Sequence, residues 1–219
     1  MSKTESIIVS SFVGLACPLS FFILGWWISA TLTIYRVFPI TESSIAAAAL
    51  LGLCAGILLD IVFLKKWTLK FYGFGLKLIV PVYLFWSAIA LASLMGLPFN
   101  NLVLGTLVGL YVGRRAHHAR TNDEKFRIVA RSASTLTGLV TSGETMPIAI
   151  LGLKEPWVVR IIQTMTGLEE STVAGPTGIG LVVIACMILF VVQFWCTRTA
   201  AKFAFGTIGM GVKGQTTNS

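Results

Sequence analysis

Long apolar runs separated by short basic segments dominate this chain. A helix that crosses a membrane needs about 20 mostly apolar residues, and six stretches approach or reach that length. The pattern predicts one polytopic membrane domain over residues 1–219, an all-α integral membrane protein built as a bundle of about six transmembrane helices. The predicted spans are Ile7–Tyr35, Ile45–Leu64, Leu78–Leu97, Asn101–Val112, Ile128–Leu153 and Ile179–Cys196.

The composition excludes an ordinary soluble domain and a disordered chain. Hydrophobic residues make up 55% of the sequence, charged residues only 12%, and the mean hydropathy is +0.84, whereas soluble domains carry about 25% charged residues. The first apolar run is longer than that of a signal peptide and lacks a small-residue cleavage site, so we expect it to remain as a span. The polar, glycine-rich segment from about residue 199 is expected to be a flexible tail.

The basic residues predict the orientation of the bundle. With the N-terminus inside, 14 of the 17 Lys and Arg residues flank the inner ends of the spans and only 3 the outer ends, which predicts that both termini lie inside. The net charge of +8 therefore indicates anionic lipids at the inner face as partners rather than nucleic acid. These features are typical of a bacterial or archaeal cytoplasmic membrane protein.

A short amphipathic helix is expected between the fifth and sixth spans. Pro156 is suited to its first turn, and Gly167 can end it. We expect this helix to lie in the outer interface or to fold over the bundle as a lid. Its apolar face is predicted to consist of Trp157, Val158, Ile161, Ile162 and Met165.

Two stripes of small residues repeat every four positions, so that each stripe lies on one helix face. Such faces let helices approach closely in a membrane. Packing within the bundle is the simpler interpretation, and docking to a second copy or to a larger membrane complex is the alternative. One stripe runs through Ser44, Ala48, Gly52, Gly56 and Asp60, and the other through Gly105, Gly109, Gly113 and His117.

An inner-face polar site is a further hypothesis, because each stripe ends in an ionisable residue. Asp60 and His117 would meet if the stripes faced each other, and Arg114 and Arg115 could donate to the phosphate of a lipid head group or nucleotide. The alternative is that all four side chains are solvated among lipid head groups. We find no nucleophile motif, no paired catalytic carboxylates and no metal-binding spacing, and no cofactor is indicated.

The fifth span carries the most informative polar residues. Thr137, Thr141 and Glu144 share one helix face. At about 1.5 Å per residue, Glu144 lies roughly 20 Å from Arg131 at the inner edge, within a core of about 30 Å. A carboxyl group at that depth indicates a functional site.

Pro147 adds to this candidate site. Because an interior proline disrupts the helix bond to the residue four positions earlier, it would free the carbonyl of Gly143. With the hydroxyls of Ser142 and Thr145, this carbonyl offers hard oxygen ligands for a proton, Na⁺ or a cationic or hydrogen-bonding substrate. The alternative is a structural kink in which Glu144 is protonated or bonded to a neighbouring helix.

Three functions are consistent with these features. The first is a transporter or a substrate- or ion-binding membrane module, with its site at Glu144. The second is a non-catalytic structural or assembly subunit of a membrane complex, which would use the glycine stripes to dock. The third is a lipid-modifying enzyme at the inner face, which would require a further acid or nucleophile beside His117.

Overall fold

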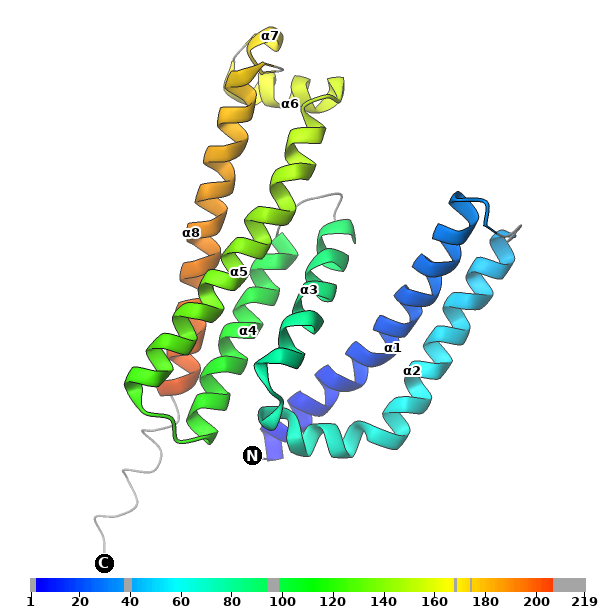
Figure 1. The fold of residues 1–219 in the computed structure, drawn as a ribbon, viewed down its shortest axis with the longest axis vertical. Coiled ribbons are helices and arrows are strands. Elements are labelled where there is room, and N and C mark those ends of the chain that lie inside the picture. Colours follow the sequence, from blue (N-terminus) through cyan, green and yellow to red (C-terminus); the bar gives the residue numbers. More distant parts are fainter. Residues whose placement is uncertain (1–2, 38–40, 94–98, 168, 174, 207–219) are drawn as a thin grey trace, which may run out of the picture. The chain divides into compact units, whose positions relative to one another are not determined.

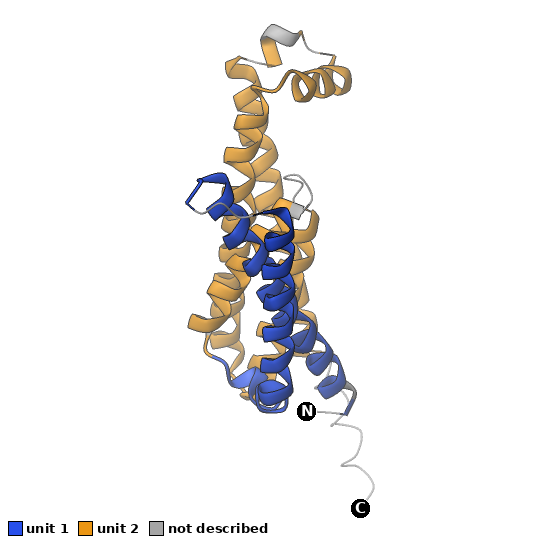
Figure 2. Ribbon diagram, turned by 90° about the vertical axis from the view of Figure 1, so that its right-hand side faces the viewer, with its two compact units in different colours: residues 1–74 blue, residues 75–219 orange. Residues whose placement is uncertain are grey.

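The computed structural model describes residues 3–37, 41–93, 99–167, 169–173 and 175–206. In these ranges the chain forms helices and turns and no β-strand (Figure 1). The helices group into two compact units, residues 1–74 and residues 75–219 (Figure 2).

The first unit is a pair of long apolar helices. α1 spans Lys3–Ile34, α2 spans Glu42–Lys70, and the 3-10 turn η1 (Phe71–Gly73) follows. The two helices include nearly all of the first two predicted spans and begin a few residues before them. A hydrogen bond of 2.8 Å from the Tyr72 hydroxyl to the Glu5 carboxylate joins the end of this unit to the start of α1.

Small residues allow α1 and α2 to pack closely. A Cβ atom added at Gly52 would overlap the carbonyl oxygen of Phe21, and one added at Gly56 would overlap the backbone of Pro18. This glycine face of α2 is therefore in contact with α1 of the same chain. Its use in docking to a second chain remains a prediction.

The described part of the second unit contains six helices, of which α8 packs against both α4 and α5. Glycines on α4 permit this contact: a Cβ atom at Gly109 would overlap the Thr197 carbonyl oxygen, and one at Gly113 the Ala201 carbonyl oxygen. The helices are α3 (Leu76–Ser93), α4 (Phe99–His118), α5 (Asp123–Gly152), α6 (Pro156–Thr166), α7 (Glu170–Val173) and α8 (Pro176–Gly206).

The C-terminal half of α8 is held in place by an apolar cluster. Ala201 is fully buried against Phe126 and Ala130, and the ring of Phe205 stacks on that of Phe126 with centroids 4.1 Å apart. The segment predicted as a flexible tail is consequently helical from residue 199 to Gly206. Residues 207–219 lie outside the described part of the chain.

Helix α6 lies across the end of α5, and the prediction of a helix here is confirmed. The two axes differ by 102°, and Gly167, with a φ of 69°, ends α6 in the left-handed conformation. The predicted apolar face is divided, however. Of its members, Ile162 packs against a cluster that includes Leu153 and Val173, while Trp157, Ile161 and Met165 remain exposed. The most buried residue of α6 is Val159, which was not part of the predicted face.

The helices have the length and hydropathy of a multi-pass membrane protein. Among the described residues, α1, α2 and α8 are long and apolar enough to cross a membrane, and the bent pair α5–α6 is a fourth candidate. α3 contains a shorter apolar stretch, and α4 carries polar residues at both ends. An all-α membrane protein with three to four candidate spans follows from the structure, whereas six is the number predicted from the sequence.

Candidate functional site

A row of polar side chains on one face of α5 points into the interior of the second unit. Ser134, Thr137 and Thr141 are fully buried, and Glu144 is half-buried one turn further along. Because these residues are spaced three or four apart, they share one side of the helix over about 15 Å. Buried polar side chains need hydrogen-bond partners, which a face of this length must find within α5 or on the neighbouring helices.

Glu144 connects three helices through hydrogen bonds. Its Oε2 accepts one bond of 2.6 Å from the Ser87 hydroxyl on α3 and one of 3.2 Å from the Asn101 side-chain amide on α4. The same amide nitrogen also lies 3.0 Å from the Ser87 oxygen. Ser87 and Asn101 are both 0% exposed. The carboxylate thus fixes α3 and α4 against α5.

Several buried polar atoms around this carboxylate have no hydrogen-bond partner. They are the amide oxygen of Asn101, the hydroxyl of Thr141 and the hydroxyl of Tyr83. The Tyr83 hydroxyl lies within electrostatic reach of the Thr141 and Ser87 hydroxyls and of Glu144, but none of these contacts has the geometry of a hydrogen bond. A buried polar group without a partner typically costs about 1–3 kcal/mol. These three oxygen atoms are therefore available to interact with a bound species.

A second polar group lies about two turns nearer the N-terminus of α5. The hydroxyls of Thr137 and Thr197 are 2.9 Å apart, and the Gln193 amide nitrogen lies 3.1 Å from the Thr197 hydroxyl oxygen. The amide oxygen of Gln193 has no partner. Gly105 makes this arrangement possible, because a Cβ atom there would overlap the Gln193 amide.

The other residues predicted for the site are placed differently. The Ser142 hydroxyl donates to the Gly138 carbonyl over 2.8 Å, and the Thr145 hydroxyl donates to the Thr141 carbonyl over 2.7 Å. Gly143 is exposed, with open space where a Cβ atom would be. α5 also continues across Pro147 to Gly152. The structure therefore gathers Glu144, Thr141 and Thr137 at the interior site. Thr145 is also buried, but its hydroxyl is bonded within α5, and Ser142 and Gly143 lie nearer the surface.

The partners of Glu144 on other helices were not predicted from the sequence. Ser87, Asn101 and Gln193 are uncharged polar residues within or next to apolar segments, and such residues commonly hydrogen-bond across helices in membranes. This rule could have identified Asn101 and Gln193 as inward-facing. It could not have paired Asn101 with Glu144, since this pairing depends on how the helices are arranged.

The residues of the inner-face hypothesis belong to different units. Asp60 lies in residues 1–74, where it is buried next to Cys17 of α1. His117, Arg114 and Arg115 occupy the last turns of α4 in residues 75–219 and are half-buried. The meeting of Asp60 with His117 therefore remains a prediction. No cluster of three or more His, Cys, Asp or Glu side chains suited to a metal occurs in the ranges that the structure describes.

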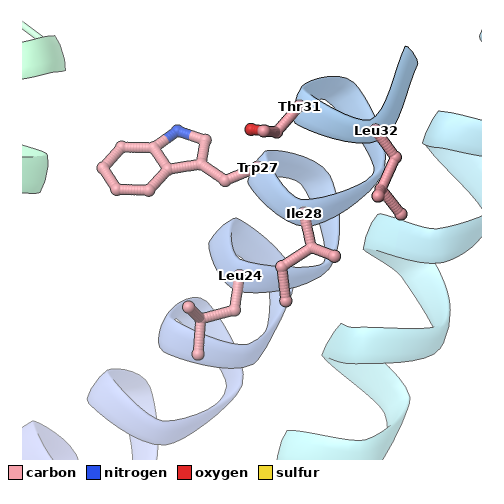
Figure 3. A pocket seen from close by; sticks show the side chains of 5 residues that line it. All are labelled: Leu24, Trp27, Ile28, Thr31 and Leu32. Atoms are coloured by element: carbon pink, nitrogen blue, oxygen red, sulfur yellow. The ribbon is translucent and has the colours of Figure 1, made fainter. Parts of the chain in front are cut away.

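Two surface hollows lie away from the polar interior of the second unit. One, of about 270 Å³, lies along α1 beside Trp27, Leu24 and Ile28 (Figure 3). The other, of about 400 Å³, lies along α6 beside Trp157 and Met165. Both are lined mainly by apolar side chains. We therefore take the enclosed polar groups around Glu144 as the candidate site.

Comparison of the chain with models of known protein families, with curated proteins and with solved structures finds no match.

Proposed function

We propose that the protein is a multi-pass membrane transport protein that binds a small positively charged or hydrogen-bond-donating species at Glu144. One observation carries this proposal: the Glu144 carboxylate accepts bonds from two other helices, and buried oxygens without partners surround it. Ionisable groups inside a membrane are costly and commonly mark ion or substrate pathways. A purely structural contact would need the bonds to Ser87 and Asn101, but not the additional unpaired oxygens.

The experiment that tests this function is charge movement across vesicles that contain the purified protein. We expect a jump in external pH, Na⁺, Li⁺ or K⁺ to produce a current with the wild-type protein. Glu144→Gln, which preserves shape and one hydrogen-bonding oxygen, should abolish it. If the wild type behaves as empty vesicles do for every ion, the structural-subunit alternative is the better explanation.

The proposed topology has six spans with both termini inside. α3 and α4 would then cross the membrane as a shorter pair between the long helices, and the basic segment 114–131 would lie inside, facing anionic lipids. In this arrangement α6, perpendicular to α5, would lie in the outer interface. Its exposed residues Trp157 and Met165 would face lipid, as is typical of interfacial amphipathic helices.

Cysteine labelling in a variant without the four native cysteines tests this topology. Membrane-impermeant reagents are expected to reach cysteines at positions 100, 160 and 169 only from outside, and those at 122 and 219 only from inside. A cysteine at position 165 should be protected by lipid, whereas one at the exposed position 160, about 140° around α6, should be labelled. Labelling of position 169 from inside would contradict the six-span topology, and equal labelling of 160 and 165 would contradict the interfacial position of α6.

A further inference from the structure

The oxygen atoms around Glu144 favour a particular class of ligand. A carboxylate can only accept hydrogen bonds, so the Asn101 amide must direct its nitrogen toward Glu144. This orientation fixes the Asn101 amide oxygen as the end without a partner. The hydroxyls of Thr141 and Tyr83 are also unpaired and buried. The unused atoms are thus all oxygens, which are the ligands that hard cations prefer.

The charge of the site points to a single positive charge. Glu144 is bonded to the neutral side chains of Ser87 and Asn101, and no ion pair to Glu144 occurs among the residues of the described ranges. A lone carboxylate in a medium of low dielectric constant requires a compensating charge. One carboxylate balances one monovalent cation, whereas a divalent ion would leave a positive charge uncompensated.

The enclosure of the site limits the size of the ligand. Ser87, Asn101 and Thr141 are 0% exposed, and Tyr83 is 5% exposed. Polar groups buried to this degree, with Glu144 half-buried beside them, suit an ion that has lost its water shell better than an organic solute.

We propose that a dehydrated monovalent metal cation binds between α3, α4 and α5, coordinated by Glu144, the Asn101 amide oxygen and the hydroxyls of Thr141 and Tyr83. The cation replaces the missing partners of the three neutral oxygens and neutralises the carboxylate. This inference rests on the proposed function, because it names the species that the Glu144 site would hold.

The test is thermal unfolding of the purified full chain in detergent, at constant pH and ionic strength. Choline chloride is exchanged stepwise for NaCl, LiCl or KCl. We expect one of these cations to raise the unfolding midpoint by several degrees with saturation, because a ligand that binds only the folded state stabilises it. Glu144→Gln should abolish this shift, and Thr141→Val should weaken the apparent affinity about tenfold or more, the range expected for a lost buried interaction of about 1.4 kcal/mol.

Thr106→Val is the matched control for the threonine variant. Thr106 lies on α4, and its hydroxyl donates to the Leu102 carbonyl of its own helix, so the cation-dependent shift should remain as in the wild type. A midpoint that no cation changes overturns the inference. So does a shift that Glu144→Gln retains, or a midpoint that responds to pH alone, which would identify a proton as the compensating charge. A cation-dependent shift without charge movement in vesicles would instead contradict the transport function and leave the cation site intact.

Discussion

Replacement of Gly109 by leucine is expected to prevent α4 from packing on α8 and to reduce the yield of folded protein in mild detergent. An added Cβ atom alone would overlap the Thr197 carbonyl oxygen, which belongs to the backbone and cannot move aside as a side chain could. Overpacking typically costs about 1–3 kcal/mol. Displacement of α8 from α4 should also disturb the nearby hydrogen bond between Thr137 and Thr197, because Thr197 lies on α8.

Gly180→Leu is the matched control on α8. Gly180 is exposed, and no atom of a neighbouring residue lies within 4 Å of the position of its Cβ. This variant should be as stable as the wild type or slightly more so, because glycine disfavours a helix interior by about 1 kcal/mol. Thermal unfolding and size-exclusion chromatography provide the comparison. Equal stability of Gly109→Leu and Gly180→Leu would show that the close contact of α4 with α8 is absent.

Asn101→Leu is expected to destabilise the second unit by about 1.5–3 kcal/mol, the usual contribution of a hydrogen bond to a charged group. The substitution leaves the Glu144 carboxylate with only the Ser87 hydroxyl as a donor. Thermal unfolding of the purified protein measures the effect. Adding Glu144→Gln to this variant should recover part of the lost stability, because the neutral amide needs less compensation than the carboxylate.

The neighbouring Asn100→Leu variant is the control for this effect. Asn100 is exposed, and surface substitutions usually change stability by no more than about 0.5 kcal/mol. If Asn100→Leu and Asn101→Leu unfold at the same temperature, the buried hydrogen bonds of Glu144 do not hold α3 and α4 against α5.

The helical elements could be predicted from the sequence more fully than their contacts. The apolar runs located the long helices, and Pro156 with Gly167 located α6. The side of α6 that is buried was predicted less well. Val159 is buried in a cluster with Leu153 of α5 and Val173 of α7, whereas Trp157 and Met165 are exposed. Helical periodicity identifies an apolar face, but the neighbouring elements decide which part of it is covered.

For the candidate site, too, the positions of residues within one helix could be predicted from the sequence, whereas their contacts with other helices could not. Spacing alone placed Thr137, Thr141 and Glu144 on one face. Ser142 and Thr145 were also expected to offer oxygens, but a hydroxyl within a helix readily donates to a carbonyl three or four residues earlier, and both do so here. Ser87 and Asn101 could be paired with Glu144 only from the structure, because they lie 57 and 43 residues away in the sequence.

The most direct test of a transport function at Glu144 is the current recorded from vesicles during a rapid exchange of choline for the cation that stabilises the purified protein. The account predicts a saturable current with the wild type and with Thr106→Val, and none above that of empty vesicles with Glu144→Gln. A wild-type current that Glu144→Gln retains in full, or the absence of any current from folded wild-type protein, would contradict it.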